Sequence, residues 1–238
     1  MGSFPDAEAI AHFRAARSRI LDGVAAACRR VGRDAADVTL VAVSKTVEAS
    51  RLAAAVAAGL TLLGENRVQE AESKAPALPD ARWHLIGPLQ ANKARRAVAL
   101  FDAIESVDSL DLAQRLDRIA AEMKRGPVGV YLQVNVDRDR AKSGFPPETL
   151  EAGLPALARM PNLQLLGLMT VGLLAGNAEE ARPTFVRLRE LSGRLRARVP
   201  ALGEGLSMGM TDDYQVAVEE GATVIRVGRA LFGERPRV

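Results

Sequence analysis

Hydrophobic residues along this chain alternate between short continuous runs and longer amphipathic stretches. The short runs predict buried strands, at 37–45, 61–66, 83–88, 101–107, 128–136, 164–171, 205–210 and 223–228. Helical patterns separate nearly all of these runs, and the clearest lie at 48–59, 112–125 and 177–199. Such alternation predicts an α/β fold with a parallel sheet and right-handed crossovers.

The count of eight predicted strands favours a single TIM-like (β/α)8 barrel domain over residues 1–238. An open doubly wound sheet is the alternative, although no G-x-G-x-x-G turn follows the first strand, which weakens its nucleotide-binding form. An extra N-terminal helix is predicted at 6–32, with Gly32 at its end. Little chain follows the eighth strand, so we expect this extra helix to cover part of the gap left by a missing eighth helix.

The composition excludes several classes of protein. Hydrophobic residues make up 48% of the 238 residues and charged residues 26%, as in ordinary globular domains. No apolar run is long enough for a membrane span, and the N-terminus lacks the pattern of a secretory signal. The single cysteine, Cys28, excludes an internal disulfide framework and suits a reducing compartment. We therefore expect a cytoplasmic protein without membrane association. We also expect a monomer.

The charge and the scarcity of metal ligands narrow the partners further. The net charge of +3 and the aromatic content of 4% do not indicate nucleic-acid binding. With two histidines and one cysteine, the sequence assembles no metal site.

Candidate chemistry collects where strands end, because the active sites of such barrels lie at the C-terminal ends of their strands. Lys45 ends a strand that is otherwise nearly all apolar. Desolvation at such a position makes an amine a better nucleophile toward aldehydes, although a lysine can also pack its stem and keep its ammonium in water. Gly209 and Gly228 end the seventh and eighth strands, where backbone N–H groups often bind a phosphate; ordinary turn glycines are the alternative.

Arg226 is a lone charge between apolar Ile225 and Val227. A buried guanidinium needs a partner or open water. The sequence leaves two interpretations open: a ligand-binding arginine, or an ion pair with a carboxylate on a neighbouring strand.

Seven motifs stand in order along the chain: VAVSKT, GENRVQEAESK, WHLIGPLQANK, KSGF, GLMTVG, LSMGMTDD and IRVGRALFG. Together they resemble the motifs of the pyridoxal phosphate homeostasis protein family, over residues 20–234. The order of the motifs, rather than any single one, makes this resemblance specific. It implies a fold-type III barrel that binds pyridoxal 5′-phosphate (PLP), like the N-terminal domain of alanine racemase.

The resemblance also implies a set of cofactor-binding residues. Lys45 in VSKT would form the Schiff base, Asn66 in GEN would lie beside the cofactor ring, and Arg226 in IRVG would face the pyridine nitrogen. The phosphate would be held by Ser207 and by the backbone N–H groups of Met208, Gly228 and Arg229.

The chain departs from the family pattern at three places. Ala141 precedes Lys142 where the family commonly has serine, and Val171-Gly172 follows the GLMT motif in place of an apolar–proline pair. Arg229 stands where a hydroxyl residue is common. Its guanidinium either makes a charge-assisted contact to the phosphate or points to solvent.

An arginine at the ring nitrogen argues for a carrier rather than an enzyme. Because arginine stays charged and cannot accept the nitrogen's proton, it weakens the ring as an electron sink. Racemases of this fold also use a second base from an added β-domain, whereas this chain ends at Val238, and no motif assigns Tyr131 or Tyr214 as that base. We therefore expect no catalytic residues, and a protein that holds PLP for intracellular homeostasis, with PLP-dependent apo-enzymes as acceptors and an indirect effect on amino-acid and keto-acid metabolism.

Two alternatives remain open at this point: a weak PLP-dependent racemase or lyase, and a Schiff-base aldolase on the same barrel. Lys142 and a basic cluster of Lys93, Arg95 and Arg96 are candidates for a second PLP site, with a solvated surface as the alternative. His84, in the third predicted strand, is interpreted as a core histidine with a hydrogen-bond partner.

Overall fold

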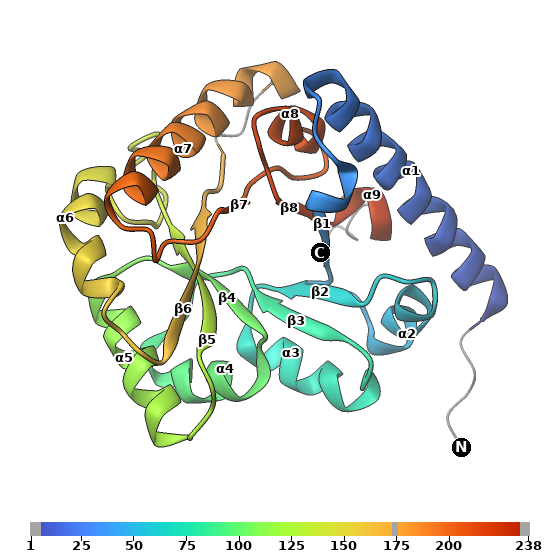
Figure 1. Ribbon diagram of the computed structural model, residues 1–238. Coiled ribbons are helices and arrows are strands. Elements are labelled where there is room, and N and C mark those ends of the chain that lie inside the picture. Colours follow the sequence, from blue (N-terminus) through green and yellow to red (C-terminus); the bar gives the residue numbers. More distant parts are fainter. Residues whose placement is uncertain (1–5, 173–175, 234–238) are drawn as a thin grey trace.

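The computed structural model, which describes residues 6–172 and 176–233, is a closed barrel of eight parallel strands in sequence order (Figure 1). The strands are β1 (Thr39–Val43), β2 (Leu62–Glu65), β3 (Arg82–Leu85), β4 (Ala103–Val107), β5 (Val128–Gln133), β6 (Leu163–Met169), β7 (Gly205–Ser207) and β8 (Val224–Val227). β1 pairs with both β2 and β8, which closes the sheet. The predicted barrel is thus confirmed, and the doubly wound alternative is wrong.

Helices surround the barrel and follow the strands in turn (Figure 1). They are α1 (Ala7–Val31), α2 (Ala49–Ala57), α3 (Val68–Lys74), α4 (Ala94–Leu100), α5 (Leu110–Glu122), α6 (Pro147–Leu157), α7 (Ala178–Arg198), α8 (Tyr214–Glu219) and α9 (Arg229–Phe232). Single 3-10 turns cover Ala35–Asp37, Ala75–Ala77 and Ala91–Lys93. No helix in the described part of the chain is long and apolar enough to cross a membrane.

The N-terminal helix α1 covers the gap beside the short helix α9, as the sequence predicted. It lies across the outside of the barrel against α2 and α8 (Figure 1). Phe13 of α1 packs on Phe232 of α9 with ring centroids 5.5 Å apart. Cys28, which is buried, belongs to the same core. Gly32 ends the helix at φ 68°, a left-handed conformation that glycine adopts without strain.

Ion pairs between helices reinforce this closure. Arg182 of α7 forms ion pairs with Glu219 of α8 and with Glu220, the residue directly after α8, each at 2.7 Å. Arg30 of α1 bonds the same Glu219 at 2.5 Å. Networked pairs of this kind link α1, α7 and α8 on the side where the last helix is short.

The hydrophobic core has two parts. The larger part fills the space between the strands and the helices. A smaller apolar group comprises Val41, Leu62, Tyr131, Met169 and Val224. Successive side chains of a strand point to opposite faces, so Arg226 shares a face with Val224 and lies one step closer to the C-terminal rim. The barrel interior therefore changes from apolar to charged toward that rim.

Candidate functional site

Lys45 lies two residues beyond the end of β1, at the C-terminal rim, and is half-buried. The turn that carries it is closed by a hydrogen bond from the Val47 N–H to the Ser44 carbonyl, at 3.1 Å. Thr46 has a φ of 65°, in the left-handed region that β-branched residues rarely adopt. Strain of this kind persists only where surrounding contacts hold it, and it is common at binding sites.

Helix α3 supplies contacts that hold this turn. A carboxylate oxygen of Glu70 accepts a hydrogen bond from the Thr46 N–H at 3.3 Å. The ammonium of Lys74 donates to the Ser44 carbonyl at 2.9 Å. Both residues next to Lys45 in the chain are therefore fixed from the same helix.

Lys74 itself pairs with the buried carboxylate of Glu65 at the end of β2. Its Nζ lies 2.6 Å from Glu65 Oε1, which also accepts a hydrogen bond from the Ser44 hydroxyl at 2.8 Å. Burial raises the pKa of Glu65, and the hydrogen bonds from Lys74 and Ser44 oppose that rise. Within the described residues, Glu65 Oε2 is buried without a hydrogen-bond partner. The buried negative charge of Glu65 is therefore compensated by the ammonium of Lys74.

A chain of buried polar groups links strands on different sides of the barrel. Arg226 donates through Nη1 to the Ser207 hydroxyl at 2.5 Å and through Nη2 to the Thr170 carbonyl at 2.7 Å. The Ser207 hydroxyl donates in turn to Glu105 Oε2 at 2.5 Å. The other oxygen of Glu105 lies 2.6 Å from His84 Nδ1. We call these five residues, His84, Glu105, Thr170, Ser207 and Arg226, the interior polar chain.

Glu105 acts as the counter-ion of this chain. Burial alone would raise the pKa of Glu105, but the hydrogen bond and charge of His84, then Arg226 and Ser207, hold it below its usual value. Burial lowers the pKa of Arg226, and the negative charges of Glu105 and Asp213 oppose that change. Burial, followed by the charge of Glu105, raises the pKa of Tyr131 to about 12, so its phenol stays neutral near pH 7.

The expected site residues converge at the rim from neighbouring strands. Asn66 directly follows β2 and is half-buried, beside the strand that leads to Lys45. Arg226 pairs in register with Val41 of β1. Lys45 is four residues beyond Val41 in the chain, so the lysine at the rim and the arginine in the interior bracket the mouth of the barrel.

The predicted phosphate ligands differ in the hydrogen bonds that they make within the protein. The Met208 N–H donates to the Val224 carbonyl at 3.0 Å, and the Ser207 hydroxyl belongs to the interior polar chain. In the described residues no hydrogen bond uses the Gly228 N–H, which lies at the start of α9. The exposed guanidinium of Arg229 forms an ion pair with Asp212.

Gly209 is required by the fold itself. Its φ is +91°, and a Cβ there would lie 2.6 Å from the Cβ of Ala217. Both the positive φ and the lack of space exclude a side chain at this position. The fold therefore accounts for this glycine without a bound phosphate.

The candidates for a second cofactor site do not form one cluster. Lys142 donates to the carbonyls of Gly172 at 2.6 Å and Val171 at 3.3 Å, beyond the end of β6. Arg95 pairs with Glu122 of α5, and Arg96 pairs with Glu72 of α3. Of the three basic residues, Lys93 lines a pocket.

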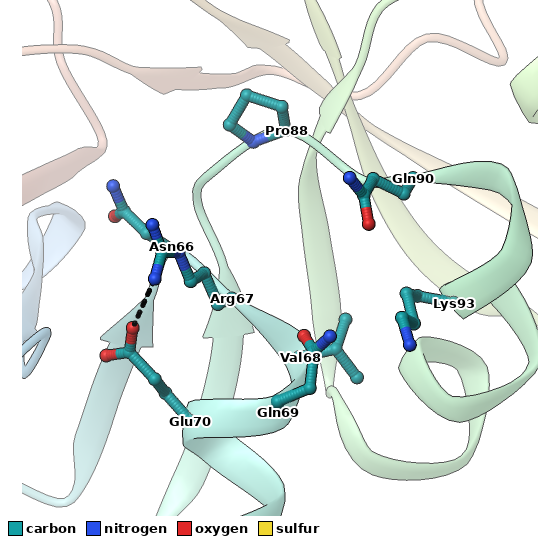
Figure 2. Close-up of a pocket in the computed structure, with 8 residues that line it drawn as sticks. All are labelled: Asn66, Arg67, Val68, Gln69, Glu70, Pro88, Gln90 and Lys93. Atoms are coloured by element: carbon teal, nitrogen blue, oxygen red, sulfur yellow. Dashed lines mark ion pairs between the residues drawn. The ribbon is translucent and has the colours of Figure 1, made fainter.

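That pocket, of about 720 Å³, lies between the segments that follow β2 and β3 and reaches Asn66 (Figure 2). Its lining comprises Asn66, Arg67, Val68, Gln69, Glu70, Pro88, Gln90 and Lys93. Arg67 faces Glu70 at 3.8 Å, the ion pair drawn in Figure 2. Amides and cations dominate its polar side chains, so the pocket forms a polar approach to the rim.

Sequence reasoning missed Glu105 and the contacts that it makes. Glu105 is an isolated charge in a buried strand, as Arg226 is in β8, and that shared pattern was the available signal. One of the two interpretations left open for Arg226 was an ion pair with a carboxylate on a neighbouring strand. The carboxylate near Arg226 is on β4, which does not neighbour β8 in the sheet, so that interpretation was wrong about the strand. His84 has the buried partner that was predicted for it.

The family model for the alanine racemase N-terminal domain matches residues 21–236 of the chain. A pyridoxal phosphate homeostasis protein of Pseudomonas aeruginosa is 44% identical over 213 residues, which cover 88% of this chain and 90% of that protein. A protein of the same name from Aquifex aeolicus is 40% identical over 221 residues, covering 92% and 96% of the two chains.

Solved structures show the same fold. PipY of Synechococcus elongatus with PLP bound superposes with a TM-score of 0.79 at 44% identity, covering 88% of this chain and all of that chain (100%). Alanine racemase of Clostridium difficile superposes with a TM-score of 0.71 at 14% identity, covering 95% of this chain and 57% of the racemase, and so shares the barrel fold alone. By the family model and the close relatives, this chain belongs to the pyridoxal phosphate homeostasis proteins, within the family of the alanine racemase N-terminal domain.

Proposed function

We propose that this protein binds PLP through a Schiff base on Lys45 and acts as an intracellular carrier of that cofactor. The observation that carries the proposal is the arrangement of two cations at one barrel mouth. Lys45 lies half-buried at the rim, and the buried Arg226 lies in the interior among polar partners. A carrier role is supported by the names of the relatives, which are homeostasis proteins, and by PipY, solved with PLP bound.

The side chains around the mouth fit the ring of PLP. Arg226 has more N–H groups than its bonds to Ser207 and Thr170 use, so one can face the pyridine nitrogen. We assign Asn66, which directly follows β2, to a place beside the ring. PLP supplies an aldehyde and an electron-withdrawing ring. A charged arginine at the nitrogen keeps that ring a poor electron sink, which suits holding the cofactor rather than transforming a substrate.

We propose that the phosphate binds at the C-terminal ends of β7 and β8. We assign its main contacts to the N–H groups of Gly228 and Arg229, since no described bond uses the first. Met208 lies beside them with its N–H in the sheet, and Ser207 lies nearer the ring through its bond to Arg226. The exposed guanidinium of Arg229 points toward Asp212 and gives the phosphate positive surroundings without a direct contact.

The acceptors of the cofactor are apo-enzymes that depend on PLP, and the protein affects amino-acid and keto-acid metabolism through them. We propose that it acts as a monomer in the cytoplasm, as a single 1–238 domain. The buried Cys28 and the low net charge of +3 are compatible with that setting.

The test is an absorbance titration of the purified protein with PLP, followed by borohydride reduction and peptide mapping. We expect an imine band and a label on Lys45. Lys45→Ala should lose both, whereas Lys142→Ala, which removes another lysine near the strand ends, should keep them. A label that maps to Lys142 or Lys93, or no imine at any PLP concentration, would reject the assignment; the second result is the one that a Schiff-base aldolase predicts.

A further inference from the structure

We infer that Glu105 and His84 are positioning residues for the cofactor ring, acting on Arg226 through the hydroxyl of Ser207. Nothing in the motifs singles out Glu105, and neither residue is a proposed ligand of PLP. The inference rests on the proposed function only where it takes Arg226 to face the ring.

The first observation is the completeness of the interior polar chain. Glu105 and Ser207 are fully buried and Arg226 is 4% exposed, so water does not mediate their contacts. Each link is a direct hydrogen bond of 2.5 to 2.7 Å, from Thr170 through Arg226, Ser207 and Glu105 to His84. A displacement of one member therefore moves the next.

The second observation concerns the direction of the Ser207 hydroxyl. An ionised carboxylate only accepts hydrogen bonds, so Glu105 takes the single proton of that hydroxyl. The hydroxyl then offers a lone pair to Arg226, which only donates. The charge of Glu105 thus fixes the orientation of the Ser207 hydroxyl. Its hydrogen points to Glu105, and its oxygen is left to accept the hydrogen bond from Arg226.

The third observation is the balance of charge in the interior. Arg226 Nη1 lies 3.9 Å from Glu105 Oε2, and a buried guanidinium needs such a counter-ion. Asp213 is the other carboxylate that acts on Arg226, but its Oδ1 accepts the Met210 N–H at 2.6 Å. His84 binds the remaining oxygen of Glu105 and holds the carboxylate toward Ser207.

These contacts assign Ser207 to the ring side of the site. The Ser207 hydroxyl donates its hydrogen to Glu105, and its oxygen accepts a hydrogen bond from Arg226. We therefore expect this hydroxyl to contribute little to the binding of the phosphate. Pyridoxal, which lacks the phosphate, distinguishes the two roles. Substituting a residue that binds the phosphate should weaken the binding of PLP but not of pyridoxal. Substituting a residue that positions Arg226 should weaken the binding of both.

The experiment measures absorbance spectra and dissociation constants for PLP and pyridoxal in a set of matched variants. Glu105→Gln keeps the shape and removes the charge; we expect roughly tenfold to hundredfold weaker binding of both ligands, the loss of one charge-assisted hydrogen bond, and a shifted absorbance maximum. Ser207→Ala should weaken the binding of PLP and of pyridoxal by a similar factor. Ser192→Ala, at a buried serine of α7, is the control and should change neither.

His84 is tested by rescue. His84→Leu removes the partner of Glu105, while His84→Asn can place an amide nitrogen near the position of Nδ1. We expect His84→Leu to shift the spectrum in the direction of Glu105→Gln and His84→Asn to restore it in part. Equal spectra for the two variants would overturn the role of His84.

A double-mutant cycle connects these effects to Arg226. In an Arg226→Met background, Glu105→Gln should cause no further loss of PLP binding. Without PLP, each single variant should lower the melting temperature, and the double variant should recover part of that loss because no unpaired buried charge remains. Additive effects, or a Ser207→Ala effect that vanishes with pyridoxal, would overturn the inference.

The thermal cycle also separates this inference from the proposed function. If the wild-type protein formed no imine with PLP, the proposed function would fail. Coupling between Glu105 and Arg226 in the protein without PLP would still establish the ion pair, and its absence would reject the pair even in a protein that binds PLP.

Discussion

The ammonium of Lys74 lies 2.9 Å from the carbonyl oxygen of Ser44, the residue directly before Lys45. The same ammonium is paired with Glu65. A buried ion pair on the helix side of the barrel therefore holds the strand end that presents the proposed Schiff-base lysine. This support is separate from the interior polar chain, so the two faces of the barrel wall each contribute one part of the site.

Replacing Lys74 by methionine should cost more stability than its single contact implies. Lys74→Met leaves the carboxylate of Glu65 buried without its cation, and breaking such a pair costs about 3–5 kcal/mol. Chemical denaturation measures the loss. Lys93→Met, which removes a half-buried lysine at the rim, should stay within about 0.5 kcal/mol of wild type. The variant Lys74→Met/Glu65→Leu should be more stable than Lys74→Met alone, and an equal or lower stability would show that the ion pair is not the cause.

The stability that depends on Glu105 should vary with pH in a defined direction. Because the folded-state pKa of Glu105 lies below its ordinary value of 4.5, its stabilising contribution is present above 4.5 and is lost as the pH falls through the folded-state pKa. The difference in unfolding free energy between wild type and Glu105→Gln should therefore be largest near neutral pH and shrink in acid. Denaturation of both proteins across that pH range measures it. A difference that grows in acid would contradict the assigned direction.

Arg226 calls for a neutral substitution rather than a reversal of charge. Arg226→Glu would put a second carboxylate close to Glu105 in a buried site, which we expect to unfold the barrel. Arg226→Gln keeps a hydrogen-bond donor for Ser207 and removes the positive charge. We expect this variant to bind PLP with a changed absorbance spectrum, read by titration. A spectrum identical to that of wild type would place Arg226 away from the ring.

Bound amino acids should not turn over in this site. Tyr131 belongs to the apolar group of the barrel interior with its pKa raised to about 12, and Tyr214 packs against Gly23 of α1. We therefore expect neither to return a proton to a substrate at the rim. Hydrogen–deuterium exchange at Cα for a panel of amino acids, followed by mass spectrometry, should show no exchange above that of free PLP. Rapid exchange with turnover would instead support the racemase or lyase.

The helix α1 should be needed for a stable barrel. Phe13 is fully buried against Phe232 and the core behind β1. Phe13→Ala should cost about 3–5 kcal/mol, the usual cost of deleting a buried aromatic side chain, measured by denaturant titration. Val31→Ala on the same helix, where the side chain is exposed, is the control and should change little.

Part of the site was readable from single residues in their local context. Lys45 stands out because a charged residue ends an apolar strand, and Asn66 and Gly228 follow from motifs at strand ends. The roles of Ser207 and Met208 are harder to assign from the sequence, because each has a hydrogen-bond partner on another strand that the sequence does not indicate. Lys74 was hidden in a helix where a lysine ordinarily faces solvent.

The local pattern of residues was enough to predict the alternation of strands and helices, their number, and the rim at which the motifs meet. Those features depend on hydrophobic period and on turn residues, which act over a few positions along the chain. The tertiary structure alone decided that Arg226 meets Glu105 across the interior and that α3 holds the turn at Lys45. A buried charge takes its partner from whichever strand closure of the barrel brings within reach, and that choice has no local pattern in the sequence.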